Sequence, residues 1–168
     1  MDPHVDSSSV HADQEDLENS DLYPFKQVID ELNHEDFFVM VTHIKYPAYD
    51  KENPASISSA IMKDLLRDRL GYTGIVVTDD LEMGAVNKYF TYEDLGCQAV
   101  ASGADMLLVC HTEENQQKVF NGILDGVKSG EISEERLDEA VQRILEYKYK
   151  NITSIKVNVE KAETIVGD

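Results

Sequence analysis

Three short apolar runs divide the chain, and each is typical of a buried β-strand. They cover residues 37–44, 74–77 and 105–110, and Val, Ile, Leu, Met or Phe dominate each run. Such near-continuous runs are expected in sheets whose strands are buried on both faces. The pattern therefore predicts three strands, with long connections between them.

Apolar residues at helical spacing lie before, between and after these runs. Thr91 and Ser133 are placed to cap two of the helices, and Gly71 follows the end of a third. The predicted helices cover residues 22–32, 58–70, 91–103, 112–130 and 133–145. Helical crossovers require parallel strands, so the fold class is α/β, as a small open sheet or as part of a (β/α)-barrel.

Length and charge narrow the range of functions. The 168 residues suit a single domain, and the formal net charge of -18 gives a pI near 4.5. Nucleic acids and anionic membranes repel such a chain, so we expect neither as a partner. No apolar run is long enough to span a bilayer and no secretory signal opens the sequence, so, taken literally, the chain is expected to be cytoplasmic.

The sequence offers no pattern that would hold a metal or cofactor, and we expect none. Cys97 and Cys110 lack a CxxC spacing and are interpreted as small buried hydrophobic residues. His4, Asp6 and His11 lie in an acidic start without a zinc or calcium motif. A solvated acidic arm accounts for that segment better.

The best candidate for chemistry is the acidic pair Asp79 and Asp80, which directly follows the second strand. In β/α proteins the carboxyl end of a strand faces the ligand side, where a carboxylate can act as acid, base or nucleophile. Either residue could instead cap the next helix, but one carboxylate would suffice for that. From the pattern alone, the two interpretations are about equal.

Several sequence segments, in order, carry a family resemblance. Residues 78–85 (Thr-Asp-Asp-Leu-Glu-Met-Gly-Ala) closely resemble the nucleophile segment of bacterial β-N-acetylhexosaminidases of glycoside hydrolase family 3. Further segments similar to that family are 42–48, 54–58, 103–109 and 135–145. The resemblance covers roughly residues 2–147, and the ordered set of matches is far more specific than any one of them.

The resemblance implies a (β/α)-type barrel and a retaining double displacement on a carbohydrate that contains N-acetylglucosamine. Asp79 would be the nucleophile that forms a covalent glycosyl-enzyme. Asp80 fits that role less well and is either a substrate-binding residue or a group that caps a helix or orients a loop. His43, inside the 42–48 match, either contacts the sugar or satisfies a buried hydrogen bond.

The expected proton donor of the family, a His paired with an Asp in an Asp-Ser-His sequence, is altered here. Asp6 matches the Asp of that dyad, but Ser8 stands where the His is expected. A hydroxyl is far too weak an acid to replace an imidazolium. His11, three residues further on, is the substitute acid/base that we carry forward.

The family's earlier strands and substrate-gripping residues precede everything in this sequence, so the N-terminus appears to be missing and the parent protein could be secreted. We therefore expect the C-terminal portion of a (β/α)8 TIM-type barrel, with about three parallel strands and flanking helices. Residues 1–21 would be a flexible acidic remnant of the catalytic loop, 22–150 the partial barrel and 151–168 a tail. Open sheet edges predict self-association or pairing with a complementary half-barrel.

Two functions remain open at this point. The parent activity would be the removal of terminal N-acetylglucosamine from cell-wall-derived glycans, as in peptidoglycan recycling, with the isolated chain inactive for want of an acid and a complete sugar pocket. The alternative is a non-catalytic half-barrel or assembly partner. A β-glucosidase of the wider family is disfavoured, because those enzymes show an aromatic residue just after the nucleophile.

Overall fold

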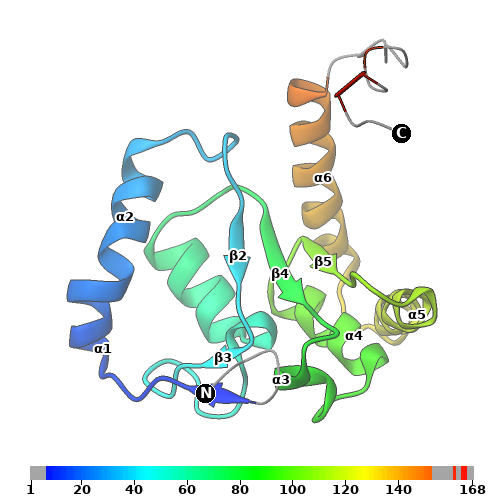
Figure 1. Ribbon diagram of the computed structural model, residues 1–168, viewed down its shortest axis with the longest axis horizontal. Helices are drawn as coiled ribbons and strands as arrows, with labels where there is room; N and C mark the ends of the chain where they lie inside the picture. The colour runs from blue at the N-terminus through cyan, green and yellow to red at the C-terminus, as the bar shows by residue number, and fades with distance from the viewer. Residues whose placement is uncertain (1–6, 153–160, 162–163, 166–168) are drawn as a thin grey trace.

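The computed structural model describes residues 7–152, 161, 164 and 165. Its sheet consists of three parallel strands in the order β2 (Val39–Val41), β4 (Val76–Asp80) and β5 (Met106–Leu108), and a smaller parallel pair joins β1 (Ser8–Ser9) to β3 (Ile44–Lys45). The helices are α1 (Gln14–Asp16), η1 (Leu17–Asp21), α2 (Leu22–Glu31), η2 (Ala55–Ile57), η3 (Ala60–Arg69), α3 (Gly84–Asn87), α4 (Tyr92–Ser102), α5 (Glu113–Ser129) and α6 (Glu134–Asn151). This arrangement confirms an α/β fold with parallel strands (Figure 1).

Local signals place the helix ends where the sequence predicts them. The Thr91 side chain accepts a hydrogen bond from the Asp94 N–H at 3.1 Å, and Ser133 does the same for the Arg136 N–H at 3.1 Å. Gly103 and Gly130, at positive φ values of 126° and 83°, end α4 and α5. Short-range capping therefore fixes these boundaries.

The first predicted strand is shorter than its apolar run. β2 ends at Val41, after which the Thr42 carbonyl accepts a hydrogen bond from the Ser56 N–H at 3.0 Å. The chain then buries His43 and continues as β3 beside β1. The run breaks because its last residues bond to η2 and β1 instead of extending the sheet.

The helix predicted over residues 58–70 begins later and is wider than an α-helix. η3 has π-type hydrogen bonding, and the Leu70 N–H that follows it donates to the Leu65 carbonyl at 2.9 Å. Periodicity alone does not distinguish this from an α-helix, because Met62, Leu65 and Leu66 still face the core.

The described residues before Asp21 include the strand β1 and the helical segments α1 and η1. Asp13 caps α1 by accepting a hydrogen bond from the Asp16 N–H at 2.8 Å, and Leu17 is only 2 % exposed. One buried leucine and one cap are enough to fix a short helix against the sheet edge, although the composition of the segment is highly polar.

The predicted apolar face of α2 is mostly uncovered. Ile29 is buried, but Phe25 is 53 % and Leu32 is 55 % exposed. In Figure 1, α2 lies beside β2, the strand at one edge of the three-stranded sheet. An edge strand offers less surface than a central one, so most of this face finds no cover within the described chain.

The two faces of the sheet differ. Val39, Val41 and Val76 face the helices and pack into or against the main core cluster. Strand register places Met40 opposite Val77, on the other face, where Met40 is 49 % exposed. One face is therefore core, whereas the other is exposed at Met40 in the edge strand and buried at Val77 in the central strand.

Helices α4 and α5 approach each other unusually closely. A Cβ atom added to Gly122 would overlap the backbone carbonyl of Glu93, and one added to Gly96 would overlap the carbonyl of Val119. Only glycine permits this spacing, so the pair packs as one rigid layer beside β5.

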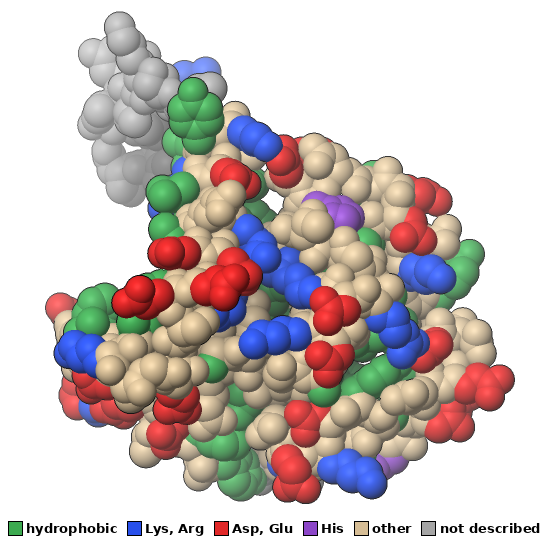
Figure 2. Space-filling model, turned by 180° about the vertical axis from the view of Figure 1, so that it is seen from behind, with side chains coloured by type: hydrophobic (Ala, Val, Ile, Leu, Met, Phe, Trp, Pro, Cys, Tyr) green, Lys and Arg blue, Asp and Glu red, His purple; other side chains and the backbone are tan. Residues whose placement is uncertain are grey.

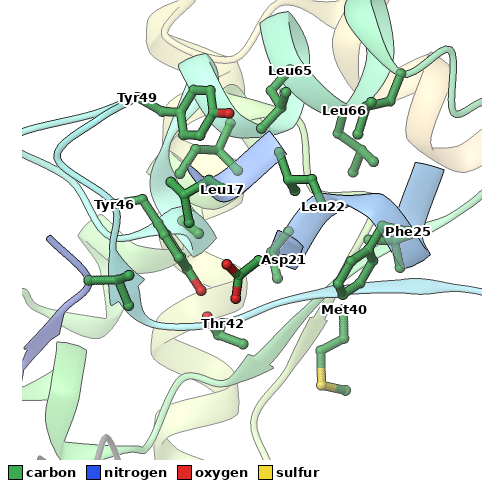
Figure 3. A pocket seen from close by; sticks show the side chains of 16 residues that line it. Leu17, Asp21, Leu22, Phe25, Met40, Thr42, Tyr46, Tyr49, Leu65 and Leu66 are labelled. Carbon is green, nitrogen blue, oxygen red and sulfur yellow. The ribbon is translucent and has the colours of Figure 1, made fainter. Parts of the chain in front are cut away.

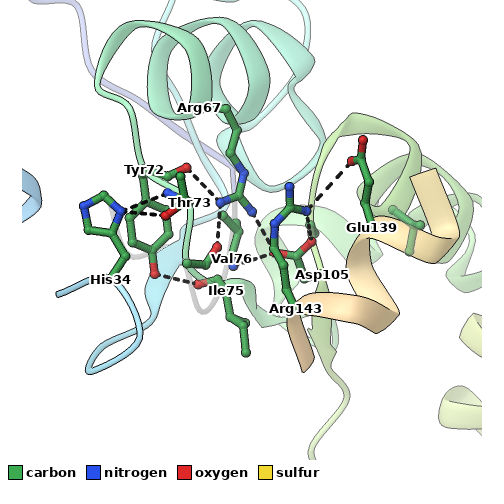
Figure 4. A network of polar contacts seen from close by, with 12 residues as sticks. His34, Arg67, Tyr72, Thr73, Ile75, Val76, Asp105, Glu139 and Arg143 are labelled. Atoms are coloured by element: carbon green, nitrogen blue, oxygen red, sulfur yellow. Dashed lines mark hydrogen bonds and ion pairs between the residues drawn. The ribbon is translucent and has the colours of Figure 1, made fainter. Parts of the chain in front are cut away.

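The amino-terminal end of the sheet is closed by a buried carboxylate, which Figure 4 shows among its partners. Asp105 Oδ2 accepts hydrogen bonds from Arg67 Nη2 at 2.7 Å and from the Val76 N–H at 3.0 Å. Its Oδ1 accepts from Arg136 Nη2 at 2.7 Å and Arg143 Nη1 at 3.1 Å. The carboxylate thus ties β4, η3 and α6 to the start of β5.

A polar cavity of about 440 Å³ lies beside this network, and Lys63, Asp68 and Glu135 line it together with the arginines. Lys and Arg side chains gather near the middle of the face in Figure 2, with Asp and Glu on both sides. Positive and negative side chains therefore meet around this cavity.

Candidate active site

Asp79 and Asp80 end β4, where the pairing with β5 has a register irregularity between Val77 and Asp80. Asp79 is partly buried. Its Oδ1 accepts a hydrogen bond from the Asp80 N–H at 2.8 Å, and no other hydrogen bond or ion pair reaches its side chain from the described residues. The second oxygen of Asp79 thus has no such partner among these residues.

The Asp80 carboxylate is occupied by the protein itself. Its Oδ1 accepts hydrogen bonds from the Glu82 N–H at 3.1 Å and the Cys110 N–H at 3.2 Å, and its Oδ2 lies 3.1 Å from His111 Nε2. These contacts join the turn after β4 to the end of β5. They favour the loop-orienting interpretation of Asp80 over direct contact with a sugar.

Glu82 strengthens the same connection. It accepts hydrogen bonds from the His111 N–H at 2.6 Å, the Thr112 N–H at 3.2 Å and the Asn115 amide at 2.7 Å. Desolvation would raise the pKa of Glu82, but the bonds from Asn115, Thr112 and His111 prevail and lower it to about 2. The loops after β4 and β5 are thus held together next to Asp79.

His43 is the most deeply buried titratable side chain at this end, with 1 % exposure. Its Nδ1 lies 2.8 Å from Ser56 Oγ and its Nε2 lies 2.8 Å from the Asp80 carbonyl oxygen. Burial lowers the pKa of His43 below 6.5, and this outweighs the opposite effects of the Asp80 hydrogen bond and the Asp79 and Asp80 charges. Both ring nitrogens have protein partners, which favours the buried-hydrogen-bond interpretation over sugar contact.

No hydrogen bond or ion pair among the described residues joins the predicted acid/base residues to Asp79. Asp6 lies outside the described residues. Ser8 belongs to β1 and pairs with Ile44, next to His43. His11 is exposed between β1 and α1 and has no hydrogen bond or ion pair to the rest of the described chain.

An apolar pocket of about 300 Å³ lies elsewhere, between α2, β2 and η3 (Figure 3). In that view the Asp21 carboxylate and the Tyr46 hydroxyl turn toward each other at its polar end. Neither Asp79 nor His43 lines this pocket. It follows the free edge of β2 and is distinct from the candidate active site.

Across the described residues, no group of three or more His, Cys, Asp or Glu side chains could hold a metal ion. Among the same residues, no helix has the length and apolar character needed to cross a membrane.

Sequence reasoning missed the partners of His43, Asp80 and Glu82. Ser56, Cys110, His111 and Asn115 reach the site from segments distant in sequence, and no local pattern marks them. The only available signal for Ser56 was its place within residues 54–58, one of the segments that carry the family resemblance.

Parallel strands flanked by helices, with a carboxylate at the carboxyl end of the central strand, define an α/β domain. The chain belongs to glycoside hydrolase family 3, because residues 1–147 match the model of the "Glycosyl hydrolase family 3 N terminal domain".

Relatives within the family are named as hexosaminidases. A β-hexosaminidase of Nitrosomonas eutropha is 33% identical over 123 residues, which are 73% of this chain and 34% of that protein. The family 3 β-N-acetylglucosaminidase structure from Paenibacillus sp. str. FPU-7 superposes with a TM-score of 0.85 at 36% identity, over 98% of this chain and 33% of that one. The Thermotoga maritima β-N-acetylglucosaminidase gives 0.77 at 27% identity, over 83% and 30%. The chain thus spans about a third of the length of these relatives.

Proposed function

We propose that this chain carries the nucleophile of a retaining β-N-acetylhexosaminidase that removes terminal N-acetylglucosamine from cell-wall-derived glycans, as in peptidoglycan recycling. The observation that carries the proposal is the Asp79 side chain, which lies at the carboxyl end of β4 and accepts a single hydrogen bond from the described residues. The names of the relatives support the substrate class. The chain would be the C-terminal part of the barrel.

In this mechanism Asp79 attacks the anomeric carbon from below the sugar ring, and the bond to the leaving-group oxygen breaks as an acid protonates that oxygen. Water then attacks the same carbon, its proton passes to the deprotonated acid of the first step, and the bond to Asp79 breaks. Asp6 holds the position of the dyad's Asp, and His11 is the substitute acid/base candidate. Because Ser8 occupies the expected His position, we expect the isolated chain to show no meaningful turnover.

The test is hydrolysis of a chromogenic N-acetyl-β-glucosaminide by the purified chain, by Asp79→Gly with added azide, and by the matched neighbour Asp80→Gly with azide. Azide rescue confined to the Asp79 variant would establish Asp79 as the nucleophile and would overturn the expected inactivity. Equal rescue at both positions, or at Asp80 alone, would refute the assignment of Asp79.

We also propose that the chain self-associates or pairs with a complementary half-barrel. Large apolar side chains are exposed on several elements around the sheet. Phe25 lies on α2, Met40 in β2, Phe120 on α5 and Leu145 on α6. Such surfaces favour association. Sedimentation of the chain and of Met40→Lys tests this: a mass above 18.9 kDa that falls in the variant supports it, and a monomer in both contradicts it.

A non-catalytic half-barrel is the second candidate function. The observation that favours it is Ser8 in β1, where the resemblance expects a His. A folded, associating chain that shows neither turnover nor azide rescue would support this candidate over the enzyme.

A further inference from the structure

The hydrogen bonds of His43 define its tautomer. A carbonyl oxygen can only accept, so the 2.8 Å contact with the Asp80 carbonyl requires a proton on Nε2. The neutral ring then has a lone pair on Nδ1, which accepts the hydroxyl proton of Ser56 at 2.8 Å. The lowered pKa of His43 agrees with a neutral imidazole.

The carbonyl that His43 binds belongs to the residue whose N–H orients Asp79. The Asp80 N–H donates to Asp79 Oδ1 at 2.8 Å, while the Asp80 carboxylate accepts from the Glu82 and Cys110 N–H groups. Asp80 is thus held at its carbonyl by His43 and at its side chain by the two loops. The orientation of the Asp79 carboxylate depends on both.

The support behind His43 is also rigid. Ser56 is fully buried, and its N–H donates to the Thr42 carbonyl at 3.0 Å. Thr42 precedes His43 directly, so η2 and the end of β2 fix the ring from two sides. Little freedom is left for the imidazole to turn toward a ligand.

We propose that His43 is a positioning residue for Asp79: seated on Ser56, its Nε2–H holds the Asp80 carbonyl and so aims the Asp79 carboxylate, without contacting the sugar. The significance for catalysis rests on the proposed function, but the positioning itself concerns only this chain. A 1 Å misplacement of a reacting group can cost a hundredfold in rate, so such an anchor would act on kcat.

The experiment compares His43→Gln with His34→Gln in the full chain. His34 is a matched control, because its ring also lies 2.9 Å from a hydroxyl, Thr73 Oγ1, and 2.8 Å from a carbonyl, Ile29 O. It lies before β2, at the opposite end of the sheet from Asp79. Nuclear magnetic resonance reads the His43 tautomer, the Asp79 carboxyl shift and the hydrogen exchange of the Asp80 amide.

We expect the Nε2–H tautomer in the unaltered chain, a faster Asp80 amide exchange by about tenfold in His43→Gln, and a shifted Asp79 carboxyl resonance. His34→Gln should leave both Asp signals unchanged. Unchanged Asp signals in a folded His43→Gln variant, or an Nδ1–H tautomer in the unaltered chain, would overturn the proposal. Should His43→Gln fail to fold, Ser56→Ala provides the test instead. This variant removes the hydroxyl that donates to His43 Nδ1, so the Asp80 amide should exchange faster and the Asp79 carboxyl resonance should shift, as expected for His43→Gln.

If the chain hydrolyses the glycoside, alone or in an assembly, its kcat and KM give a second test of the role of His43. A positioning role predicts a lower kcat with KM nearly unchanged in His43→Gln, whereas a raised KM with unchanged kcat would make His43 a sugar contact. If no form of the chain hydrolyses the glycoside, the proposed activity of the isolated chain fails, but the resonance measurements still decide the role of His43.

Discussion

The two ends of the sheet hold carboxylates in opposite conditions. At the amino-terminal end the Asp105 side chain is fully buried, and three arginines and a backbone N–H satisfy both its oxygens. At the carboxyl-terminal end Asp79 is partly buried and accepts a single hydrogen bond. A fully compensated charge maintains the fold, whereas a carboxylate with unused acceptor capacity can act on another molecule.

The largest effect should come from Asp105→Asn, which removes the charge that Arg67, Arg136 and Arg143 share. We expect a loss of about 3–5 kcal/mol in the free energy of unfolding, because buried cations are left unpaired. Urea denaturation measures this. Glu139→Gln is the control, since this half-exposed residue lies 3.2 Å from Arg136 but should cost below about 1 kcal/mol. Equal losses would mean that burial does not distinguish the two carboxylates.

Tyr72→Phe probes the same closed end with a smaller change. The Tyr72 hydroxyl is buried and donates to the Phe37 carbonyl at 2.9 Å, so its removal should cost about 1 kcal/mol. Burial raises the pKa of Tyr72 to about 12, despite the opposing charge of Arg67. A raised pKa gives stability that is present below pH 10 and lost as the pH rises toward 12. The Phe variant should lack this alkaline loss, and a parallel decline in both proteins would contradict the assignment.

Glu82→Gln tests the open end, where the carboxylate only links two loops. We expect a loss below about 1 kcal/mol at neutral pH, because solvent screens the site. The pKa of Glu82 is lowered to about 2, so its contribution is present above pH 4.5 and lost as the pH falls toward 2. Urea denaturation at several pH values should show that the free energy of unfolding of the variant falls less between pH 4.5 and pH 2 than that of the unaltered chain. An equal fall in both proteins would show that the hydrogen bonds to Glu82 are not formed in solution.

Asp79→Asn should have the smallest effect on stability. An Asn side chain keeps an oxygen that can accept the Asp80 N–H, and no buried ion pair is broken, so the change should stay within about 0.5 kcal/mol. Thermal unfolding provides the check. A loss as large as that of Asp105→Asn would place Asp79 in the structural framework and remove the contrast between the two ends.

The features of the fold that depend on nearby residues could be predicted from the sequence. Helical spacing, the cap at Thr91 and the stop at Gly103 depend on residues within one or two turns, and they place α4 correctly. The position of Asp79 at the end of β4 was also predictable, because an apolar run followed by acids is a local pattern, and its role as nucleophile stays a prediction. Membership of glycoside hydrolase family 3 is confirmed.

Long-range pairing was not predictable in the same way. Arg67 and Arg143 reach Asp105 across 38 positions each, and nothing near any of the three marks the contact. The same holds for His43, whose choice between sugar and carbonyl depends on a residue 37 positions away. The exposure of the apolar face of α2 was not predictable either, because periodicity shows which residues share a face but not what covers it.

The close approach of α4 and α5 at Gly122 has a consequence for the order of folding. These helices and the short strand between them are contiguous in sequence, so they can meet without closing a long loop. The pairing of β2 with β4 instead needs the whole crossover through η3 to be in place. In pulsed hydrogen exchange during refolding, we therefore expect α4 and α5 amides to become protected before those of β2, so that the strand carrying Asp79 docks onto a layer already formed.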